Sequence, residues 1–157
     1  MSLNGFEFSE FTGLIEQLEQ LGADMDQVAE RVLDAGSEPA RLAFQKNVPR
    51  SKKNKEHAQD NVMVSKTRES KYGNKYRVIG AAGKKVDMKR TRVTSKGKVQ
   101  HYTEKYADQF SYLYFVEHGT TRAPARPFLE KAYRDAQAAA NEPMKNALVQ
   151  EIENHLR

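Results

Sequence analysis

Cysteine is absent from this sequence, and its absence excludes disulfide bonds and thiolate metal sites. A chain without cysteine is typical of a protein made in a reducing compartment. Long hydrophobic runs are also missing: none approaches the ~18 residues of a membrane-spanning helix, and the N-terminus carries no signal-peptide pattern. We therefore expect no membrane partner. Hydrophobic residues make up 38% of the chain, against roughly 45–50% in a compact domain, so part of it should lie outside the core.

Charge is divided unevenly along the chain. Residues 46–105 carry 18 Lys and Arg against 5 Asp and Glu, whereas the remainder carries 8 against 16. A basic middle between acidic ends indicates either a polyanionic partner or self-association between unlike surfaces. A solvated, mobile basic loop would explain the same composition.

The N-terminal part of the chain has the apolar spacing of helices. Apolar residues recur every three or four positions from Phe8 to Leu21, and again from about Asp24 to Val48. The segment Gly36–Pro39 interrupts the second pattern, so we expect a kink there, or two helices with Ser37 capping the second.

The first half of the middle region has the pattern of a hairpin. Residues 50–60 are polar and predict an exposed, mobile linker. Residues 62–67 and 76–80 are candidate strands on either side of a turn at 72–74, and together they predict an antiparallel pair.

A long basic arm is predicted over residues 84–106, with a tight turn at Ser95–Lys98. It has too few apolar residues for a core of its own, so it should project from the body and order against a partner. Its candidate contact residues are Lys84, Lys85, Lys89, Arg90, Arg92, Lys96 and Lys98. This charge would meet several DNA phosphates without reading bases, but an acidic neighbouring protein fits the same residues.

Residues 112–116 predict the strongest strand of the chain, with apolar side chains on both faces. Such a strand should be covered twice, by helices on one side and by something else on the other, for which another subunit is a candidate. Pro127 then suits the first position of a long helix. The segment Asn141–Pro143 predicts a kink or a fresh start in that helix.

Together these elements predict an α+β fold in a single domain, residues 1–157. A small antiparallel sheet with the long basic hairpin arm should cover about residues 61–117. It should pack against N-terminal helices at about 8–48 and a long C-terminal helix at about 127–156.

No cluster of residues predicts catalysis, a cofactor or a metal. The four histidines are scattered, without the spacing of helical metal ligands. Glu117 and His118 are adjacent on the predicted strand and should point to opposite faces, so they would not form an acid–base pair. Fixing the following turn, or bridging a subunit contact, suits Glu117 better. Phosphate-binding glycine loops and nucleophile motifs are also absent. We therefore expect no enzymatic activity.

The segment 114–120, followed by 125–129, resembles the signature of the phage tail-completion family. These are the head–tail joining proteins of long-tailed double-stranded DNA phages. The residues that carry the motif are Val116, Glu117, Gly119, Thr120, Pro127 and Phe128. The resemblance implies a structural role for these six residues. The upstream order is similar too, with an amphipathic helix followed by a helix ending in Val48-Pro49, but the middle of the chain is not covered.

The resemblance implies a non-enzymatic structural protein of a phage or prophage virion, made in the cytoplasm of the bacterial host. Such proteins assemble as a ring at the neck, the head-proximal end of the tail, where they help complete the tail and join it to the head. The implied partners are further copies of the chain, neighbouring head-connector and tail-tube proteins, and duplex DNA passing through the ring. The alternative from the residues alone is an independent, sequence-nonspecific DNA-binding protein that uses the basic arm, residues 84–105.

Overall fold

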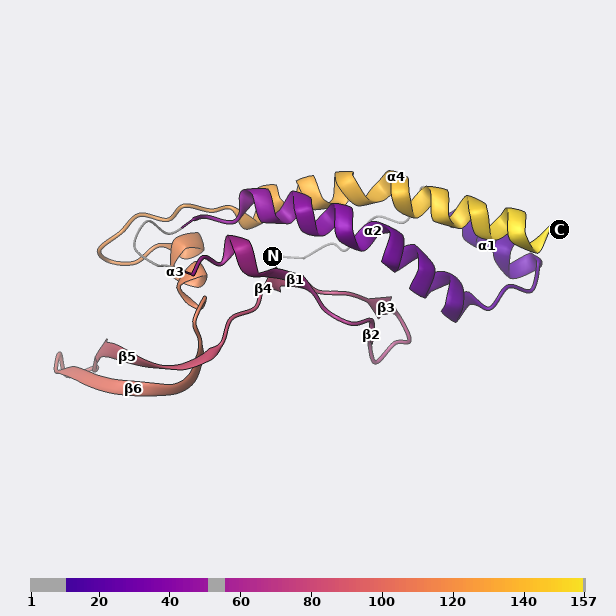
Figure 1. Ribbon diagram of the computed structural model, residues 1–157. Helices are drawn as coiled ribbons and strands as arrows, with labels where there is room; N and C mark the ends of the chain where they lie inside the picture. The colour runs from indigo at the N-terminus through magenta and orange to yellow at the C-terminus, as the bar shows by residue number, and fades with distance from the viewer. Residues whose placement is uncertain (1–10, 51–55, 157) are drawn as a thin grey trace.

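The computed structural model describes residues 11–50 and 56–156 and shows an α+β fold (Figure 1). In chain order its elements are α1 (Thr12–Gln20), α2 (Met25–Asn47), the 3₁₀ helix η2 (Gln59–Asn61), β1 (Val62–Val64), β2 (Arg68–Glu69), β3 (Lys75–Tyr76), β4 (Ile79–Ala81), β5 (Lys85–Val93), β6 (Val99–Asp108), α3 (Tyr112–His118) and α4 (Leu129–His155). The predicted fold class is confirmed. Among the helices described, none is long and apolar enough to cross a membrane.

The main core is the contact between α2 and α4, which lie side by side (Figure 1). Buried residues recur every four positions on both helices, so each helix has one stripe of buried residues that faces the other helix. These stripes are Val28, Val32, Gly36 and Ala40 on α2, and Ala132, Ala136, Ala140, Met144 and Leu148 on α4. Most of them are small, which brings the two backbones close together. A Cβ on Gly36 would lie 2.6 Å from Met144 Cγ, so this approach requires glycine.

Of the two alternatives predicted near Gly36 and Pro39, two separate helices is wrong, because α2 is a continuous helix, and the kink stays a prediction. Gly36 is buried against α4, and Ser37 Oγ donates to the Leu33 carbonyl instead of capping a new helix. Proline inside a helix costs ~3 kcal/mol, but each large apolar side chain that the helix buries contributes about 1.5–3 kcal/mol. Packing therefore outweighs the local preference, and Pro143 lies inside a continuous α4 in the same way.

The first helix was predicted over Phe8–Leu21, and α1 confirms it within the described residues. It ends just before Gly22, whose φ of 71° is the left-handed conformation that favours glycine. Residues 8–10 of the prediction lie outside the described part of the chain. Phe11 and Leu18 close one end of the core between α2 and α4.

One carboxylate is buried between α2 and α4. Glu151 is 5% exposed, and Arg31 Nη1 donates to both of its oxygens, at 2.8 and 2.6 Å. The hydrogen bonds to Glu151, and then its negative charge, raise the pKa of the Arg31 guanidinium. A buried carboxylate needs such a partner, so the pair ties the two helices together near the end of α4.

A second, smaller core lies where the strands meet the C-terminal end of α2 and the start of α4. It consists of Val48, Ala58, Val62, Phe110, Phe128 and Ala132. Ala58 is 0% exposed, which contradicts the prediction that residues 50–60 form an exposed linker throughout. A lone small residue in a polar stretch gives no periodic signal of burial. Residues 51–55 of that prediction lie outside the described part of the chain.

Residues 112–116 belong to the helix α3, so the strand predicted there is wrong. A run of five apolar residues does not distinguish a strand from a buried helix. Tyr112, Leu113 and Val116 all pack against the second core, and this spacing brings them to one side of a helix. Residues 112–116 therefore form a helix because their partly buried side chains lie on one side of a helix, whereas a strand would bury alternate residues.

The other side of α3 is open in the described chain, and its cover by another subunit stays a prediction. Tyr114 is 65% exposed and Phe115 is 41% exposed. The helix α3 ends at His118, and α4 begins at Leu129, two residues later than the predicted start at Pro127.

The hairpin predicted from residues 62–67 and 76–80 is confirmed, although its strands form two short antiparallel ladders. β1 pairs with β4 and β2 pairs with β3. Gly73, with a φ of 81°, lies in the connecting turn. Figure 1 shows this hairpin beneath α2.

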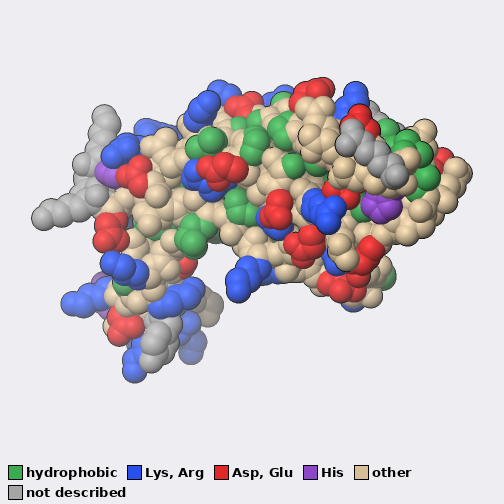
Figure 2. Space-filling view, turned by 45° about the vertical axis from the view of Figure 1, so that its right-hand side comes forward, with side chains coloured by type: hydrophobic (Ala, Val, Ile, Leu, Met, Phe, Trp, Pro, Cys, Tyr) green, Lys and Arg blue, Asp and Glu red, His purple; other side chains and the backbone are tan. Residues whose placement is uncertain are grey.

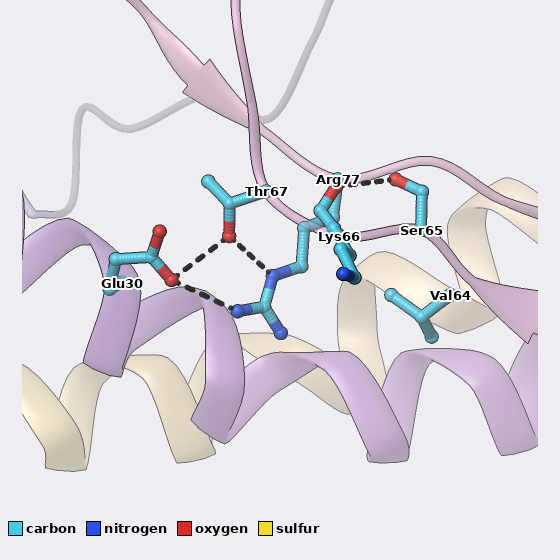
Figure 3. Close-up of a pocket in the computed structure, with 6 residues that line it drawn as sticks. All are labelled: Glu30, Val64, Ser65, Lys66, Thr67 and Arg77. Atoms are coloured by element: carbon cyan, nitrogen blue, oxygen red, sulfur yellow. Dashed lines mark hydrogen bonds and ion pairs between the residues drawn. The ribbon is translucent and has the colours of Figure 1, made fainter.

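Arg77, between β3 and β4, fastens the hairpin to α2. Its Nε donates to Thr67 Oγ1 at 3.0 Å, and its Nη2 lies 3.4 Å from Glu30 Oε2 (Figure 3). Its Nη1 lies 2.6 Å from Asp34 Oδ1 and donates to Ser37 Oγ at 3.2 Å. The guanidinium thus has four partners. Because the side chain is only 15% exposed, these contacts are partly shielded from water, which strengthens them.

We predict that Arg77→Lys lowers stability, because lysine keeps the charge but cannot supply the same fork of donors. Hydrogen bonds to charged groups are worth about 1.5–3 kcal/mol, which corresponds to a fall in Tm of roughly 3–12 °C. Thermal unfolding followed by circular dichroism measures it. Arg68→Lys is the matched control, since Arg68 is exposed on β2 and should change Tm by less than about 2 °C. Equal Tm values for the two variants would contradict the role given to Arg77.

Candidate functional site

The basic arm is a two-stranded hairpin formed by β5 and β6, and it reaches away from the helices (Figure 1). Its turn is closed by a hydrogen bond from the Thr94 N–H to the Lys98 carbonyl at 2.9 Å, and Gly97 adopts a φ of 72°. A bulge between Val86 and Met88 shifts the register near the base. Figure 2 shows Lys and Arg side chains gathered over this end of the molecule. The predicted arm is confirmed as a hairpin.

The seven candidate cations do not share one face of the arm. Residues paired across a ladder point to the same side, and successive residues alternate. The register therefore places Arg90 and Arg92 on one face and Lys89 on the other. Lys84 and Lys85 lie at the base of the arm, and Lys96 and Lys98 lie at its turn.

The two cations at the base already have partners within the chain. Nζ of Lys84 lies 3.5 Å from Glu56 Oε1, and Nζ of Lys85 lies 3.9 Å from Asp108 Oδ2. The hydrogen bond from Gln109, and then the charge of Lys84, lower the pKa of Glu56. These exposed ion pairs add little stability, but they reduce the positive charge that the base offers to a partner.

Arg90 joins the arm to α3. Its Nε lies 2.6 Å from Glu104 Oε2, and its Nη2 donates to Ser111 Oγ at 3.0 Å. The guanidinium also lies over the ring of Phe115, 5.5 Å from the ring centroid. With 22% of its side chain exposed, Arg90 positions the arm and is poorly placed to contact a phosphate.

Lys89, Lys96 and Lys98 are the candidate cations whose side-chain ammonium groups are not paired with another described residue. All three are exposed, and none forms an ion pair with another described residue. The sequence could not separate them from the paired cations, because pairing depends on the register of the two strands. They are the arm's best candidates for contact with an anionic partner.

An aromatic–arginine surface that runs from the outer half of the arm to α3 was not predicted from the sequence. It is formed by Arg90, Arg92, Tyr102, Tyr114 and Phe115. Arg92 lies over Tyr102 at 5.6 Å, as Arg90 lies over Phe115, and the rings of Tyr114 and Phe115 meet edge to face at 5.7 Å. Helical spacing would have revealed part of it, because Tyr114 and Phe115 fall on the uncovered side of α3.

The residues of the family motif connect α3 to α4. Glu117 Oε2 accepts the N–H groups of Phe128 at 2.8 Å and Leu129 at 3.2 Å. The first N–H groups of a helix lack intrahelical partners, and negative charge is favourable beside them. The Arg126 N–H also donates to the Val116 carbonyl at 2.7 Å. Glu117 therefore holds the start of α4 against the end of α3.

Gly119 and Thr120 shape the turn in this connection. The Thr120 N–H donates to the Ala123 carbonyl at 2.8 Å, and Thr120 Oγ1 accepts the Ala123 N–H at 3.1 Å. Gly119 has a φ of 76°, and a Cβ added to it would lie 2.7 Å from the backbone nitrogen of Ala125. Pro127 is exposed just before the helix. The motif thus sets the path of the backbone.

We predict that Gly119→Ala destabilises the protein. A φ of 76° with a ψ of 179° is a conformation essentially confined to glycine and costs another residue about 1–3 kcal/mol, and the added Cβ would also press on the backbone of Ala125. Gly13→Ala is the control: Gly13 lies in α1 with nothing near its Cβ position, so alanine should keep or raise stability by up to about 1 kcal/mol. Urea unfolding compares the two. Equal urea midpoints would show that the turn does not need glycine.

Two hollows of the described surface differ in polarity. The pocket in Figure 3 has a volume of about 550 Å³, and its polar lining residues Glu30, Thr67 and Arg77 bond to one another. A largely apolar groove of about 780 Å³ lies between α2, α4 and β3. The polar groups of the first pocket thus bind one another and hold the hairpin on α2.

Glu117 and His118 do not converge, although α3 is a helix and the predicted strand geometry was wrong. Glu117 bonds to the start of α4, while the ring of His118 packs on Tyr114 at 4.5 Å. Among the residues described, no three His, Asp or Glu side chains gather where they could hold a metal ion.

Comparison with known proteins gives one match. The model of the family described as "Bacteriophage HK97-gp10, putative tail-component" matches residues 13–119, more than half of the chain. No curated protein and no solved structure matches the chain. The matched range runs from α1 to Gly119 and includes the basic arm, which the motif resemblance did not cover, while Thr120, Pro127 and Phe128 lie beyond it. The chain therefore belongs to the HK97-gp10 family of phage tail components.

Proposed function

We propose that the chain is a non-enzymatic structural protein of a phage or prophage virion that forms a homo-oligomeric ring at the neck. There it helps complete the head-proximal end of the tail and join the tail to the head. The observation that carries this proposal is the family match over residues 13–119. Membership of a family of tail components supports a structural role in the virion, and the ring and its place at the neck are inferred beyond it.

The distribution of charge supports a ring made of one kind of subunit. A ring needs heterologous contacts, in which two different surfaces of the same chain meet. The arm is basic, whereas the chain outside residues 46–105 carries twice as many acidic as basic residues. Figure 1 places the arm at one end of the molecule and α1 with the C-terminal end of α4 at the other. Unlike ends of this kind favour contact between successive copies.

The proposed partners of the ring are the head-connector and tail-tube proteins on either side and the duplex DNA that passes through it. A rigid connection between α3 and α4 suits such a place, because a joining protein must hold fixed angles between its contact surfaces. Glu117 and Gly119 supply that rigidity through the helix cap and the turn.

We predict that the purified protein forms a discrete oligomer at high concentration, seen by mass photometry and as rings in negative-stain images. Assembly should be stronger at about 50 mM than at about 500 mM salt, because contacts between charged surfaces are screened. Pull-down with the products of neighbouring capsid and tail genes tests the joining role. A protein that stays monomeric and binds none of them would contradict the proposal.

A second candidate function is that of an independent, sequence-nonspecific DNA-binding protein. The observation in its favour is that the ammonium groups of Lys89, Lys96 and Lys98 are exposed and form no ion pair with another described residue. Arg90, which the sequence placed among the candidates, is less suited because it is held by Glu104 and Ser111.

We predict, under this second function, that K89Q/K96Q/K98Q weakens binding to a duplex and lowers the slope of log K against log salt by about 3. Fluorescence anisotropy with a labelled duplex of random sequence measures both. The matched control is K46Q/K131Q/K145Q, which removes three exposed helix lysines away from the arm and should leave the slope unchanged. Absence of binding by the wild-type protein at low salt would exclude this function.

A further inference from the structure

The aromatic–arginine surface is continuous from β6 to α3. Its successive contacts are Tyr102 with Arg92, and Arg90 with Phe115 and through it Tyr114. Arg90 and Arg92 occupy the same face of the arm, and Arg90 also binds Ser111 just before α3. The side chains are therefore held in place before any partner arrives, which reduces the entropy lost on binding.

The rings of this surface are unusually open to solvent. Tyr102 is 46% exposed, Tyr114 is 65% exposed and Phe115 is 41% exposed. Tyrosine, phenylalanine and arginine are the residues enriched at the centres of protein interfaces. Exposed apolar groups that gather in one place mark such sites more often than single exposed residues do.

The charges on this surface suit a protein better than a nucleic acid. Arg90 is paired with Glu104 at 2.6 Å, whereas Arg92 keeps its charge but is held in place by the neutral acceptor Gln100 at 3.1 Å and by the ring of Tyr102. The free ammonium groups are elsewhere, with Lys89 on the opposite face and Lys96 and Lys98 at the turn. Phosphate contact would therefore use those lysines, which leaves the rings for an apolar or mixed partner.

We propose that the aromatic–arginine surface is the subunit contact of the ring, and that a second copy of this chain docks on it. This inference rests on the proposed ring. Its occupant follows from charge complementarity: Arg92 is exposed on this surface and its partner Gln100 is neutral, so its positive charge remains for acidic groups, which the chain outside residues 46–105 has in excess. It follows also from the arm itself, since an isolated two-stranded hairpin is marginally stable in water. A neighbouring copy that covers one face would hold the arm in place.

The test compares three single variants of the full chain. Tyr102→Ser and Tyr114→Ser remove rings from the surface, whereas Tyr72→Ser removes a more exposed ring from the β2–β3 turn. Tyr72 is the matched control, because it is 76% exposed and lies beneath a cation, Lys71, as Tyr102 lies beneath Arg92. Sedimentation equilibrium measures assembly, and circular dichroism verifies that each variant is folded.

We expect Tyr102→Ser and Tyr114→Ser each to weaken the association of subunits at least tenfold, while Tyr72→Ser assembles like the wild type. If all three variants assemble like the wild type, the surface is not the contact and the ring proposal stands. If the wild type is monomeric at every concentration, both the contact and the self-assembled ring are overturned. Variants that keep assembly but lose duplex binding would instead assign the surface to DNA.

A second measurement keeps the proposal open to refutation even if a serine variant is unfolded. A benzophenone amino acid placed at position 114 should crosslink on irradiation to another copy, at residues outside 46–105, as peptide mass spectrometry would show. Crosslinks confined to the same chain, in a sample that contains oligomers, would overturn the proposed contact and leave the ring intact.

Discussion

The close packing of α2 on α4 is the constraint on which the rest of the structure depends. Gly36 lies so near Met144 that a single added carbon would collide with it, and this closeness sets the distance between the two helices. The same pair delivers Val48 from the end of α2 and Ala132 from α4 to the second core. Because α3 and the strands pack on that second core, the arm takes its position from the contact between the two helices.

Arginine provides the attachment of both hairpins. Two-stranded ladders bury too little surface to be stable alone, and in each hairpin here an arginine reaches a neighbouring element. Arg77 binds residues of α2, while Arg90 binds Ser111 beside α3. Both side chains are largely covered, and both combine charged and neutral partners. They therefore hold geometry more firmly than the exposed lysine pairs at the base of the arm.

The sequence predicts most of the elements, because helical spacing and turn glycines are local signals. The helices α1, α2 and α4, both hairpins and the turn at Gly97 follow from such signals. The strand at 112–116 does not, since a short apolar run fits either structure and only the position of the second core decides between them. The continuity of α2 through Pro39 likewise depends on its contact with α4, which no local pattern contains.

The sequence predicts which cationic residues the arm contains, but not which of them lie on the same face or have partners. Counting cations finds the arm, yet the register of its ladder separates the held guanidinium of Arg90 from the free head of Lys89. The register also places Tyr102 on the face of the arm that carries Arg90 and Arg92, whereas Lys89 lies on the opposite face. Contact with a second copy and contact with an anion would therefore use different side chains. A ring subunit could do both at once, holding its neighbour with one face while its lysines meet DNA, so DNA binding by this protein would not by itself argue against the ring.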